Sequence, residues 1–468
     1  MDTYSNTIAR WVAQDIGFDR LPDDVIAATR LRVLDVIGLS LAGSTTPFGA
    51  SVRRTASLYP GPRSRLWGTN ETCSVPGAAL INGALSQALE YDDTHNESIV
   101  HMSSPSVAAA LSLVDELGAS GRDLIAAVAI SNEIACRVGS VAPSQFHKRG
   151  FHPSALFAPF GVACLGSAMM RLDAARTANA LGIVGSFASG LVQCWVDGTQ
   201  SKFLHPGWAA QSGIVAAKLA EGGATGPAEV FEGRWGLFAS HLQTEEAVAD
   251  LTRLTLDLGE RWDSRNASFK PFPAAHVIHP YIDAILRLGR KHAVKPEQVA
   301  RITCPVAPYI VGIVCEPLSE KRRPLTDSHG RVSLQYTLAE ALVTGVLGRH
   351  SYAESSLRDP TILSLTDKVE YVVDESLPGP EQFKGIVRVE LNDGTIIEEI
   401  EEHNRGSAEN PMTEAEIIGK FRENTEGVIA KDAAERVVEA CLTLERMQDA
   451  SELTKLTVPS RQFEPDLG

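Results

Sequence analysis

The stretch of sequence with the most side chains able to do chemistry is ALEYDDTHNESIVHMSSPS, residues 88–106. Carboxylates and imidazoles can bind a metal ion, transfer protons, bind a substrate or be solvated in a loop. The histidines at positions 95 and 101 match no metal-ligand template, which disfavours a metal site and leaves the other three possibilities open. Between two apolar flanks the stretch holds Glu90, Asp92, Asp93, Thr94, His95, Glu97 and His101.

A second pattern places histidines beside prolines at expected helix starts. His152, His205 and His279 each precede a proline directly, and His101 lies shortly before Pro105. Proline is favoured in the first position of a helix, where free N–H groups and the helix dipole attract anions. The same positive helix end disfavours a charged imidazole and leaves a neutral ring able to act as a base. Each such histidine is also compatible with an ordinary loop-to-helix boundary, but together they favour a functional site.

Two lysines accompany these histidines. Lys202 lies in TQSKFLHPGWAAQSG, and Lys270 lies in SFKPFPAAHVIHP. A lysine beside a helix N-terminus can bind a carboxylate, whereas a single lysine is more often a surface side chain. Because each lysine shares a short segment with a His-Pro pair, we interpret both as carboxylate-binding groups.

The rest of the sequence disfavours several classes of protein. A formal net charge of −15 lacks the basic footprint that nucleic-acid binding requires. The seven cysteines form no C-x-x-C pair, which disfavours a disulfide framework and a thiolate zinc site. The chain has no Walker loop, dinucleotide fingerprint, G-x-S-x-G or H-E-x-x-H motif. With no basic-then-apolar leader and no apolar run long enough to span a bilayer, we expect a reduced, soluble, cytoplasmic protein.

The elements that must position these side chains fall into two parts. A chain of 468 residues is too long for one ordinary core, so two domains are expected. Residues 1–266 are rich in alanine, glycine and leucine at helical spacing, without strand–helix alternation, which predicts an all-helical domain. One of its helices is expected to start with Ser104 as N-cap and Pro105 in first position, and to end at Gly118.

Residues 267–407 mix β-rich runs with helical stretches, which predicts a smaller α+β domain. Two alternating runs around Asp393 and Gly394 predict a hairpin with a tight type I′ turn. The fold class is therefore mainly α, with a large helical domain and a smaller α+β domain.

The last segments are predicted to complete the helical domain. In residues 408–456, Thr413 and Glu416 are spaced as a capping box and two helices follow. These helices lack a partner face of their own, so we expect them to pack back on the first domain and make it discontinuous. The tail, residues 457–468, is expected to fray.

Several of these blocks resemble the MmgE/PrpD family nearly end to end. That family includes 2-methylcitrate dehydratase, cis-aconitate decarboxylase and iminodisuccinate epimerase. The resemblance implies a helical domain with an α+β lid, an active cleft between them, a homodimer, and no metal or organic cofactor. The blocks are LPDDVIAATRLRVLDVIGLSLAG, INGALSQALEYDDTH, RGFHPSALFAPFG, SKFLHPGWAAQSG and FKPFPAAHVIHP.

The resemblance also implies which residues form the site. Glu90 stands where decarboxylase members carry an aspartate, and His101 matches the histidine of a His-Pro-Ser block that reads HMSSPS in this chain. Tyr309 is the better match to a lid tyrosine and Tyr336 the weaker one. The remaining matches are Asp92, Asp93, Thr94, His152, Lys202 and Lys270.

The family's substrates are small di- or tricarboxylates that react at a carbon next to a carboxylate. We therefore expect Lys202 and Lys270 to bind substrate carboxylates and His101 and His152 to transfer the proton. Asp93 is expected to orient a histidine or to act as an acid. Substrate binding is assigned to Glu90, Asp92, Thr94, His205 and Tyr309.

Three functions remain open at this point. A cofactor-independent lyase, either a dehydratase or a decarboxylase, is ranked first. An epimerase or isomerase of a dicarboxylate needs the same charge-stabilising groups and comes second. A catalytically silent carboxylate-binding homologue ranks last, because this chain retains the lysines and histidines together.

Overall fold

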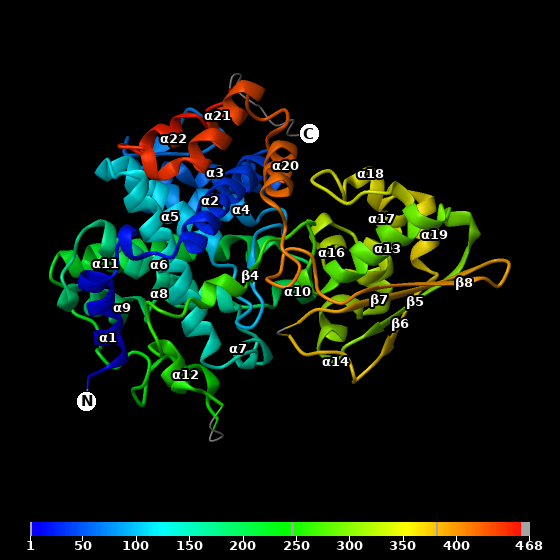
Figure 1. Ribbon diagram of the computed structural model, residues 1–468, viewed down its shortest axis with the longest axis horizontal. Coiled ribbons are helices and arrows are strands. Elements are labelled where there is room, and N and C mark those ends of the chain that lie inside the picture. Colours follow the sequence, from blue (N-terminus) through cyan, green and yellow to red (C-terminus); the bar gives the residue numbers. More distant parts are fainter. Residues whose placement is uncertain (1, 245–247, 381, 460–468) are drawn as a thin grey trace.

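The computed structural model describes residues 2–244, 248–380 and 382–459, and Figure 1 shows a larger helical body beside a smaller α+β part. The fold is mainly α, as predicted. The helical body contains α1 (Tyr4–Arg10), α2 (Asp23–Ser44), α3 (Pro47–Arg53), α4 (Val75–Gln87), α5 (Ser103–Leu117), α6 (Gly121–Ser140), α7 (Gln145–Lys148), α8 (Pro153–Met169), α9 (Ala174–Val184), α10 (Cys194–Asp197), α11 (His205–Glu221), α12 (Leu237–Leu242), α20 (Glu414–Thr425), α21 (Lys431–Leu442) and α22 (Ser451–Lys455).

The α+β part is built on a sheet with the strand order β6-β5-β7-β8, in which β5 and β6 are parallel and the other pairs antiparallel. Helix α13 packs on β7 and β8, and α17 packs on α13. Its elements are α13 (His279–His292), β5 (Val299–Val306), α14 (Pro308–Ile310), α15 (Leu318–Arg322), α16 (Asp327–Arg331), α17 (Leu334–Thr344), α18 (Glu354–Leu357), α19 (Pro360–Thr366), β6 (Val369–Val373), β7 (Gly385–Leu391) and β8 (Ile396–Glu401).

Two short ladders complete the described structure. Strands β1 (Ser64–Arg65) and β2 (Thr72–Cys73) pair antiparallel. Strands β3 (Thr94–His95) and β4 (Ala267–Ser268) also pair antiparallel, although they lie far apart in the sequence. The second ladder matters for the site, because it brings the segment before Lys270 beside the segment after Glu90.

Small residues let the central helices approach closely. A Cβ atom on Gly207 of α11 would lie 2.0 Å from the carbonyl oxygen of Leu80 in α4. A Cβ atom on Gly161 of α8 would lie 2.2 Å from the carbonyl oxygen of Ser131 in α6. Backbone contacts this close exclude any larger residue. They fix the positions of α8 and α11, the two helices whose N-termini carry His152 and His205.

The C-terminal helices pack on the N-terminal helices (Figure 1). The ammonium of Lys420 in α20 lies 2.8 Å from a carboxylate oxygen of Asp35 in α2, and it donates a 2.8 Å hydrogen bond to the Tyr91 carbonyl. Burial raises the pKa of Asp35 to about 6, against the opposing effect of Lys420. A helix from the end of the chain thus holds the backbone of the acidic stretch.

Two large buried clusters form the cores. One extends from Ile8 to Ala267 and resumes from Phe421 to Leu453, and the other extends from Phe272 to Val389. The domain boundaries at 1–266, 267–407 and 408–456 stay a prediction.

The local predictions have mixed outcomes. The capping box of Thr413 and Glu416 at the start of α20 is confirmed, as is the end of α5 at Gly118, which has a left-handed backbone. The predicted N-cap is wrong, because α5 begins at Ser103 and no side chain caps it. The hydroxyl of Ser104 instead donates to Asp92.

The hairpin between β7 and β8 is confirmed, but its turn type is wrong. Leu391 and Thr395 close a three-residue loop, in which Gly394 alone has a positive φ, of 87°. A type I′ turn needs positive φ at both central residues, whereas a three-residue loop needs one left-handed residue at its end. Of the predicted frayed tail, residues 460–468 lie outside the described residues.

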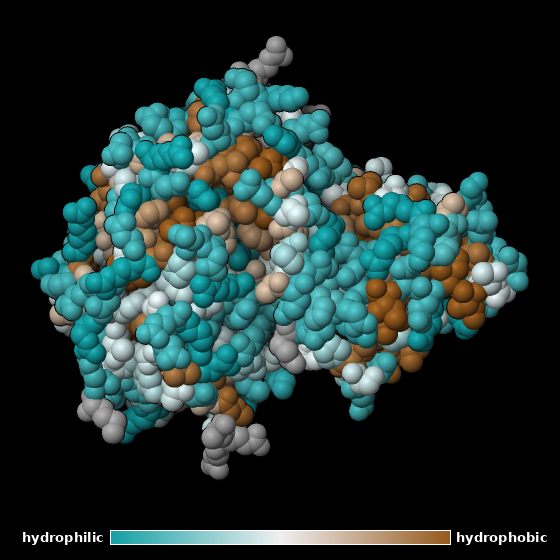
Figure 2. All heavy atoms as spheres, in the orientation of Figure 1, coloured by the Kyte–Doolittle hydropathy of each residue, from teal (hydrophilic) through white to brown (hydrophobic). Residues whose placement is uncertain are grey.

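The face of the molecule in Figure 2 is mostly hydrophilic, with separate hydrophobic patches. No helix among the described residues has the length and apolarity needed to cross a membrane.

Candidate active site

A cavity of about 410 Å³ lies where the helical body meets the α+β part. Its polar lining comes mainly from the helical body, including Glu90, Thr94, His101, His152 and Lys202. The α+β part contributes a lining that is mainly apolar. The structure therefore brings together most of the residues that the sequence singled out, and it adds Asn96, His147, Trp195 and His276, which sequence reasoning missed.

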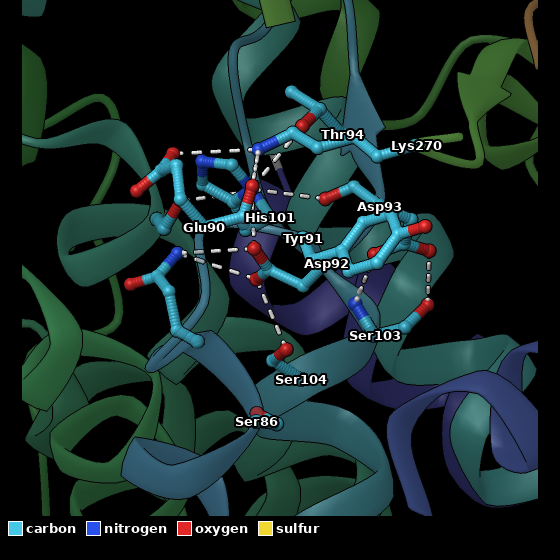
Figure 3. Close-up of polar contacts among 12 residues, drawn as sticks. Ser86, Glu90, Tyr91, Asp92, Asp93, Thr94, His101, Ser103, Ser104 and Lys270 are labelled. Atoms are coloured by element: carbon cyan, nitrogen blue, oxygen red, sulfur yellow. Dashed lines mark hydrogen bonds and ion pairs between the residues drawn. The ribbon is translucent and has the colours of Figure 1, made fainter. Parts of the chain in front are cut away.

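Glu90 forms ion pairs with both lysines at the floor of this cavity. One carboxylate oxygen, Oε1, pairs with the ammonium of Lys202. The same oxygen lies 3.3 Å from the ammonium of Lys270 (Figure 3). Lys270 also donates to the Glu90 carbonyl at 3.2 Å. Burial would raise the pKa of Glu90, but Lys202 and Lys270 outweigh it and hold this pKa well below its ordinary value. Burial lowers the pKa of Lys270, against the opposing effect of Glu90.

Asp93 lies behind the cavity lining, where its carboxylate connects several elements of the fold. Its carboxylate pairs with the buried guanidinium of Arg32 and accepts hydrogen bonds from the Ser103 backbone N–H at 3.2 Å and hydroxyl at 2.5 Å. Arg32 in turn donates to the Ala267 carbonyl at 3.1 Å, next to the strand that leads to Lys270. The Asp93 carboxylate therefore ties α2, α5 and β4 together.

Asp92 lies beneath the histidine of the same stretch. It accepts hydrogen bonds from the Ser104 hydroxyl at 3.0 Å and the Gln87 amide at 3.2 Å, and its Oδ1 lies 3.3 Å from Nδ1 of His101. Burial raises the pKa of Asp92 to about 6, although Lys270 opposes the shift. Neither Asp92 nor Asp93 lines the cavity. All the acids of the stretch are buried or partly buried, so the solvated-loop interpretation is wrong.

The ring of His101 is held in one tautomer. Its Nδ1 lies 3.0 Å from the Asp93 carbonyl oxygen, which can only accept, so Nδ1 carries the proton. The Thr94 hydroxyl lies 3.1 Å from the same nitrogen. Burial lowers the pKa of His101 well below its ordinary value, and Lys270 and Lys202 add to this effect. The ring is therefore neutral, with an unprotonated Nε2 able to accept a proton.

His152 forms the second basic group and is the N-cap residue of α8. Its Nδ1 lies 2.9 Å from Nδ1 of His205, the first residue of α11, and its ring centroid lies 5.7 Å from that of His101. Burial and the nearby His205 lower the pKa of His152 well below its ordinary value. Burial, with Lys202, lowers the pKa of His205 to about 4. His205 does not line the cavity and contacts it through His152.

His147 and Trp195 form part of the cavity wall that the sequence did not reveal. Their ring centroids lie 5.0 Å apart in an edge-on arrangement, and the Lys202 ammonium lies 5.8 Å from the Trp195 ring. Burial, with Lys202, lowers the pKa of His147 to about 4. No proline follows His147, so the pattern that revealed the other histidines does not include it.

Three residues of the cavity lining have left-handed backbones. Glu90, Ile99 and Ser144 have φ values of 53°, 57° and 62°. This conformation is rare for side chains other than glycine, asparagine and aspartate, above all for the β-branched Ile99. Such residues concentrate at functional sites, where the surrounding contacts maintain them. Ile99 is held by a 2.8 Å hydrogen bond from its N–H to the carbonyl of His95.

The remaining candidates lie in different places. Tyr309 lines the cavity and is 36% exposed. Tyr336, the weaker candidate, lies in the core of the α+β part and does not line the cavity. His279 is fully buried, and its Nε2 donates to the Ala274 carbonyl at 3.1 Å, so it has a packing role. Among the described residues, no group of three or more histidine, cysteine, aspartate or glutamate side chains is arranged to hold a metal ion.

This arrangement combines two ammonium groups with two neutral imidazoles in a largely buried cavity. Preorganised cations stabilise the negative charge that develops when a proton leaves a carbon next to a carboxylate. Neutral imidazoles can accept that proton or return it. The geometry is therefore suited to proton transfer on an anionic substrate.

The chain is similar to known proteins over nearly its whole length. A cis-aconitate decarboxylase-like protein of Aspergillus oryzae is 28% identical, with 96% of each chain covered. A cis-aconitate decarboxylase of Aspergillus terreus is 28% identical over 96% of this chain and 94% of its own. That of Mus musculus is 28% identical over 94% of this chain and 90% of its own.

Two models of protein-family domains match this chain, one in each part. The model of the MmgE/PrpD N-terminal domain matches residues 6–249, and that of the C-terminal domain matches residues 272–444. The first match alone covers more than half of the chain. The chain therefore belongs to the MmgE/PrpD family.

Proposed function

We propose that the protein is a cofactor-independent lyase that acts on a small carboxylic acid with more than one carboxylate, by proton transfer at a carbon next to a carboxylate. The observation that carries this proposal is the convergence of Lys202, Lys270, His101 and His152 on one cavity. The similarity to cis-aconitate decarboxylases over nearly the whole chain supports the same reaction class.

In a dehydration, a neutral imidazole takes the proton from the carbon next to a carboxylate, and the electron pair moves into that carboxylate. The pair then forms the new double bond as the carbon–oxygen bond breaks, and the leaving hydroxide takes a proton to become water. In a decarboxylation, the bond to the departing carboxylate breaks, the double bond shifts, and the far carbon receives a proton. Lys202 and Lys270 are assigned to the substrate carboxylates in both reactions.

The other residues are assigned from their contacts. The Asp93 carbonyl holds His101 in the tautomer with an unprotonated Nε2. Because Nδ1 of His101 carries a proton, it cannot accept a hydrogen bond from the Thr94 hydroxyl. The hydroxyl proton of Thr94 can therefore be donated to the substrate. His205 is assigned to positioning His152, and Tyr309, which lines the cavity, is assigned to substrate binding. Glu90 must give up part of its contact with the lysines when a substrate carboxylate binds.

Proton NMR in D₂O on the purified, EDTA-treated protein tests the proposal with 2-methylcitrate, citrate, cis-aconitate and iminodisuccinate. New vinyl signals or release of CO₂ are expected. Deuterium entering an α-carbon without loss of water or CO₂ would replace the lyase by the epimerase alternative. No change in any of the four acids would contradict the proposal for these substrates and favour the silent homologue.

We also propose that the protein is a homodimer, on the strength of the family resemblance. One chain has a mass of 50.2 kDa. Light scattering after size-exclusion chromatography is expected to give twice this mass. The monomer mass would contradict this proposal. The cytoplasmic location stays a prediction.

A further inference from the structure

The lining of the cavity forms two chemically different walls. The ionic groups Glu90, Lys202 and Lys270 and the His101 and His152 rings form one wall. The second wall, called the apolar wall here, belongs to the α+β part and consists mainly of Ala275, Val277, Tyr309, Ile313, Val332, Pro380 and Phe383.

Among the described lining residues of the apolar wall, none has a charged side chain. The ammonium of Lys321 does not line the cavity and donates to the carbonyls of Ile313 and Val332 at 2.8 Å each. The wall includes the imidazole of His276, whose pKa burial lowers well below the ordinary value. Its Nε2 lies 2.9 Å from the Asn404 amide nitrogen, and its ring packs against Phe383 at 5.1 Å between centroids. A carboxylate placed on this wall would lose its hydration without direct contact with a cationic side chain of the described lining, which is costly.

The ionic wall itself limits how many carboxylates can be paired. The described lining residues include three lysines, Lys148, Lys202 and Lys270, and no arginine. Glu90 already neutralises part of the charge of Lys202 and Lys270, and Lys148 is exposed. Two carboxylates at one end of a substrate fit this charge better than three spread over the whole molecule.

The cavity is also larger than a small polycarboxylate bound at the two lysines would fill. About 410 Å³ falls within the range of ~300–1,000 Å³ typical of pockets that bury drug-sized ligands. A six-carbon tricarboxylate on the lysines would leave the space beside Val277, Ile313 and Val332 to water on an apolar surface. An apolar substituent on the substrate would fill this space and bury that surface.

We propose that the substrate is an amphiphilic acid. Its carboxylates bind at Lys202 and Lys270, and an apolar substituent of several carbons lies against the wall formed by Val277, Ile313, Val332 and Phe383. This inference rests on the proposed function for the reacting end of the molecule and adds the nature of the other end. Ile313 and Val277 are then specificity-determining residues.

Binding of unreactive 2-alkylsuccinates tests the inference without any turnover. Isothermal titration calorimetry on the unmodified protein would compare methyl-, butyl- and octylsuccinate with propane-1,2,3-tricarboxylate. Each added CH₂ that reaches the wall is expected to lower the Kd about fourfold, which corresponds to ~0.8 kcal/mol per buried CH₂. Butylsuccinate should therefore bind about 60-fold more tightly than methylsuccinate, and more tightly than the tricarboxylate.

Matched variants locate the effect. Ile313→Asn is expected to reduce the gain to less than about twofold per CH₂, measured as the ratio of the methylsuccinate Kd to the butylsuccinate Kd within the same variant. Ile396→Asn is the control, since Ile396 is 68% exposed on β8 and does not line the cavity. Lys270→Gln should weaken all the acids by a similar factor and keep the chain-length dependence. Val277→Asn serves the same purpose if Ile313→Asn does not fold.

A Kd that does not change with chain length, or tighter binding of the tricarboxylate than of butylsuccinate, would overturn the inference. Neither result would contradict the proposed lyase reaction, because that reaction is tested separately by NMR detection of its products. Conversely, a clear chain-length dependence without turnover of the four acids of the NMR panel would support the amphiphilic ligand and exclude those four acids as substrates.

Discussion

The Nδ1 atoms of His152 and His205 lie 2.9 Å apart, within hydrogen-bond distance. One ring must donate its proton and the other must accept it, so the two cannot both be charged while this contact lasts. His152 lines the cavity, whereas His205 does not. The pair thus connects a histidine that lines the cavity to a histidine behind it, and the tautomers of the two rings depend on each other.

Substitution of this pair is expected to separate the two roles. His152→Ala should lower kcat/KM by about 10²–10⁴-fold, the usual cost of losing an acid or base. His205→Ala should cost less and should shift the pH profile of kcat/KM, because the His152 ring then loses its partner. His205→Asn restores a side chain that can donate or accept a hydrogen bond, and it should recover part of the loss.

Steady-state kinetics across pH on the true substrate would measure all three variants. Equal losses in the His152 and His205 variants, without a shift of the profile, would contradict the assignment.

Glu90→Gln is expected to have opposite effects on stability and on ligand binding. Removing one partner from a buried ion pair costs about 3–5 kcal/mol of unfolding free energy, because the remaining charge stays buried. The same change leaves Lys202 and Lys270 without their shared carboxylate, so succinate should bind more tightly. Urea denaturation would measure the stability and calorimetry the binding of succinate.

Glu97→Gln is the control, since the Glu97–Arg253 pair is partly exposed and its loss should cost no more than ~1 kcal/mol of unfolding free energy. Unchanged stability of Glu90→Gln would contradict the buried ion-pair geometry.

His147 is expected to contribute to the loss of stability in acid. Its pKa is lowered from 6.5 to about 4, so below pH 6.5 the unfolded chain binds a proton that the folded protein does not. The free energy of unfolding therefore falls as the pH drops from 6.5 to about 4, by up to ~1.4 kcal/mol per pH unit. His147→Gln should remove this part of the slope.

The comparison of variants is needed because other groups act in the opposite direction. The pKa of Asp92 is raised from 3.8 to about 6, so its contribution increases stability as the pH falls through 6. Urea midpoints of the unmodified protein, His147→Gln and the exposed-site control His350→Gln, measured between pH 4 and 8, would show the difference. An identical pH dependence in His147→Gln and the unmodified protein would contradict the burial of a neutral ring.

Asp93 is expected to be mainly a positioning residue. Asp93→Ala leaves the Arg32 guanidinium buried without its carboxylate, which should cost about 3–5 kcal/mol of stability. Arg32→Met combined with Asp93→Asn removes both charges and should recover most of that stability. Because the His101 hydrogen bond uses the Asp93 backbone carbonyl, the double variant should keep more activity than His101→Ala. Denaturation and kinetics together would check this. Activity as low as that of His101→Ala in a stable double variant would show that the carboxylate itself takes part in the reaction.

Much of the local structure could be predicted from the sequence, because it depends on neighbours within a few residues. The periodicity of HPYIDAILRLGRKH corresponds to α13, His279–His292, and the capping box of Thr413 and Glu416 forms as predicted. His152, His205 and His279 lie at helix starts, since the proline that follows each favours the first turn. The three-residue hairpin loop was missed, because the Asp393-Gly394 pair fits more than one loop length.

The roles within the acidic stretch depend on tertiary structure. Local spacing does not distinguish Glu90, which faces the lysines, from Asp93, which pairs with Arg32. The contact between Lys270 and Glu90 joins residues separated by 180 positions, and it exists because β3 and β4 pair.

By itself, the sequence determined the helical character of the chain, the positions of its His-Pro helix starts and its membership of a family, since these follow from local periodicity and short motifs. Only the tertiary structure decided which histidines line the cavity, that His147 and Trp195 join them, and that the α+β part gives the same cavity a mainly apolar lining. The physical reason is that helix and cap preferences act over a few residues. Burial, ion pairing and pKa shifts depend instead on which distant segments pack together.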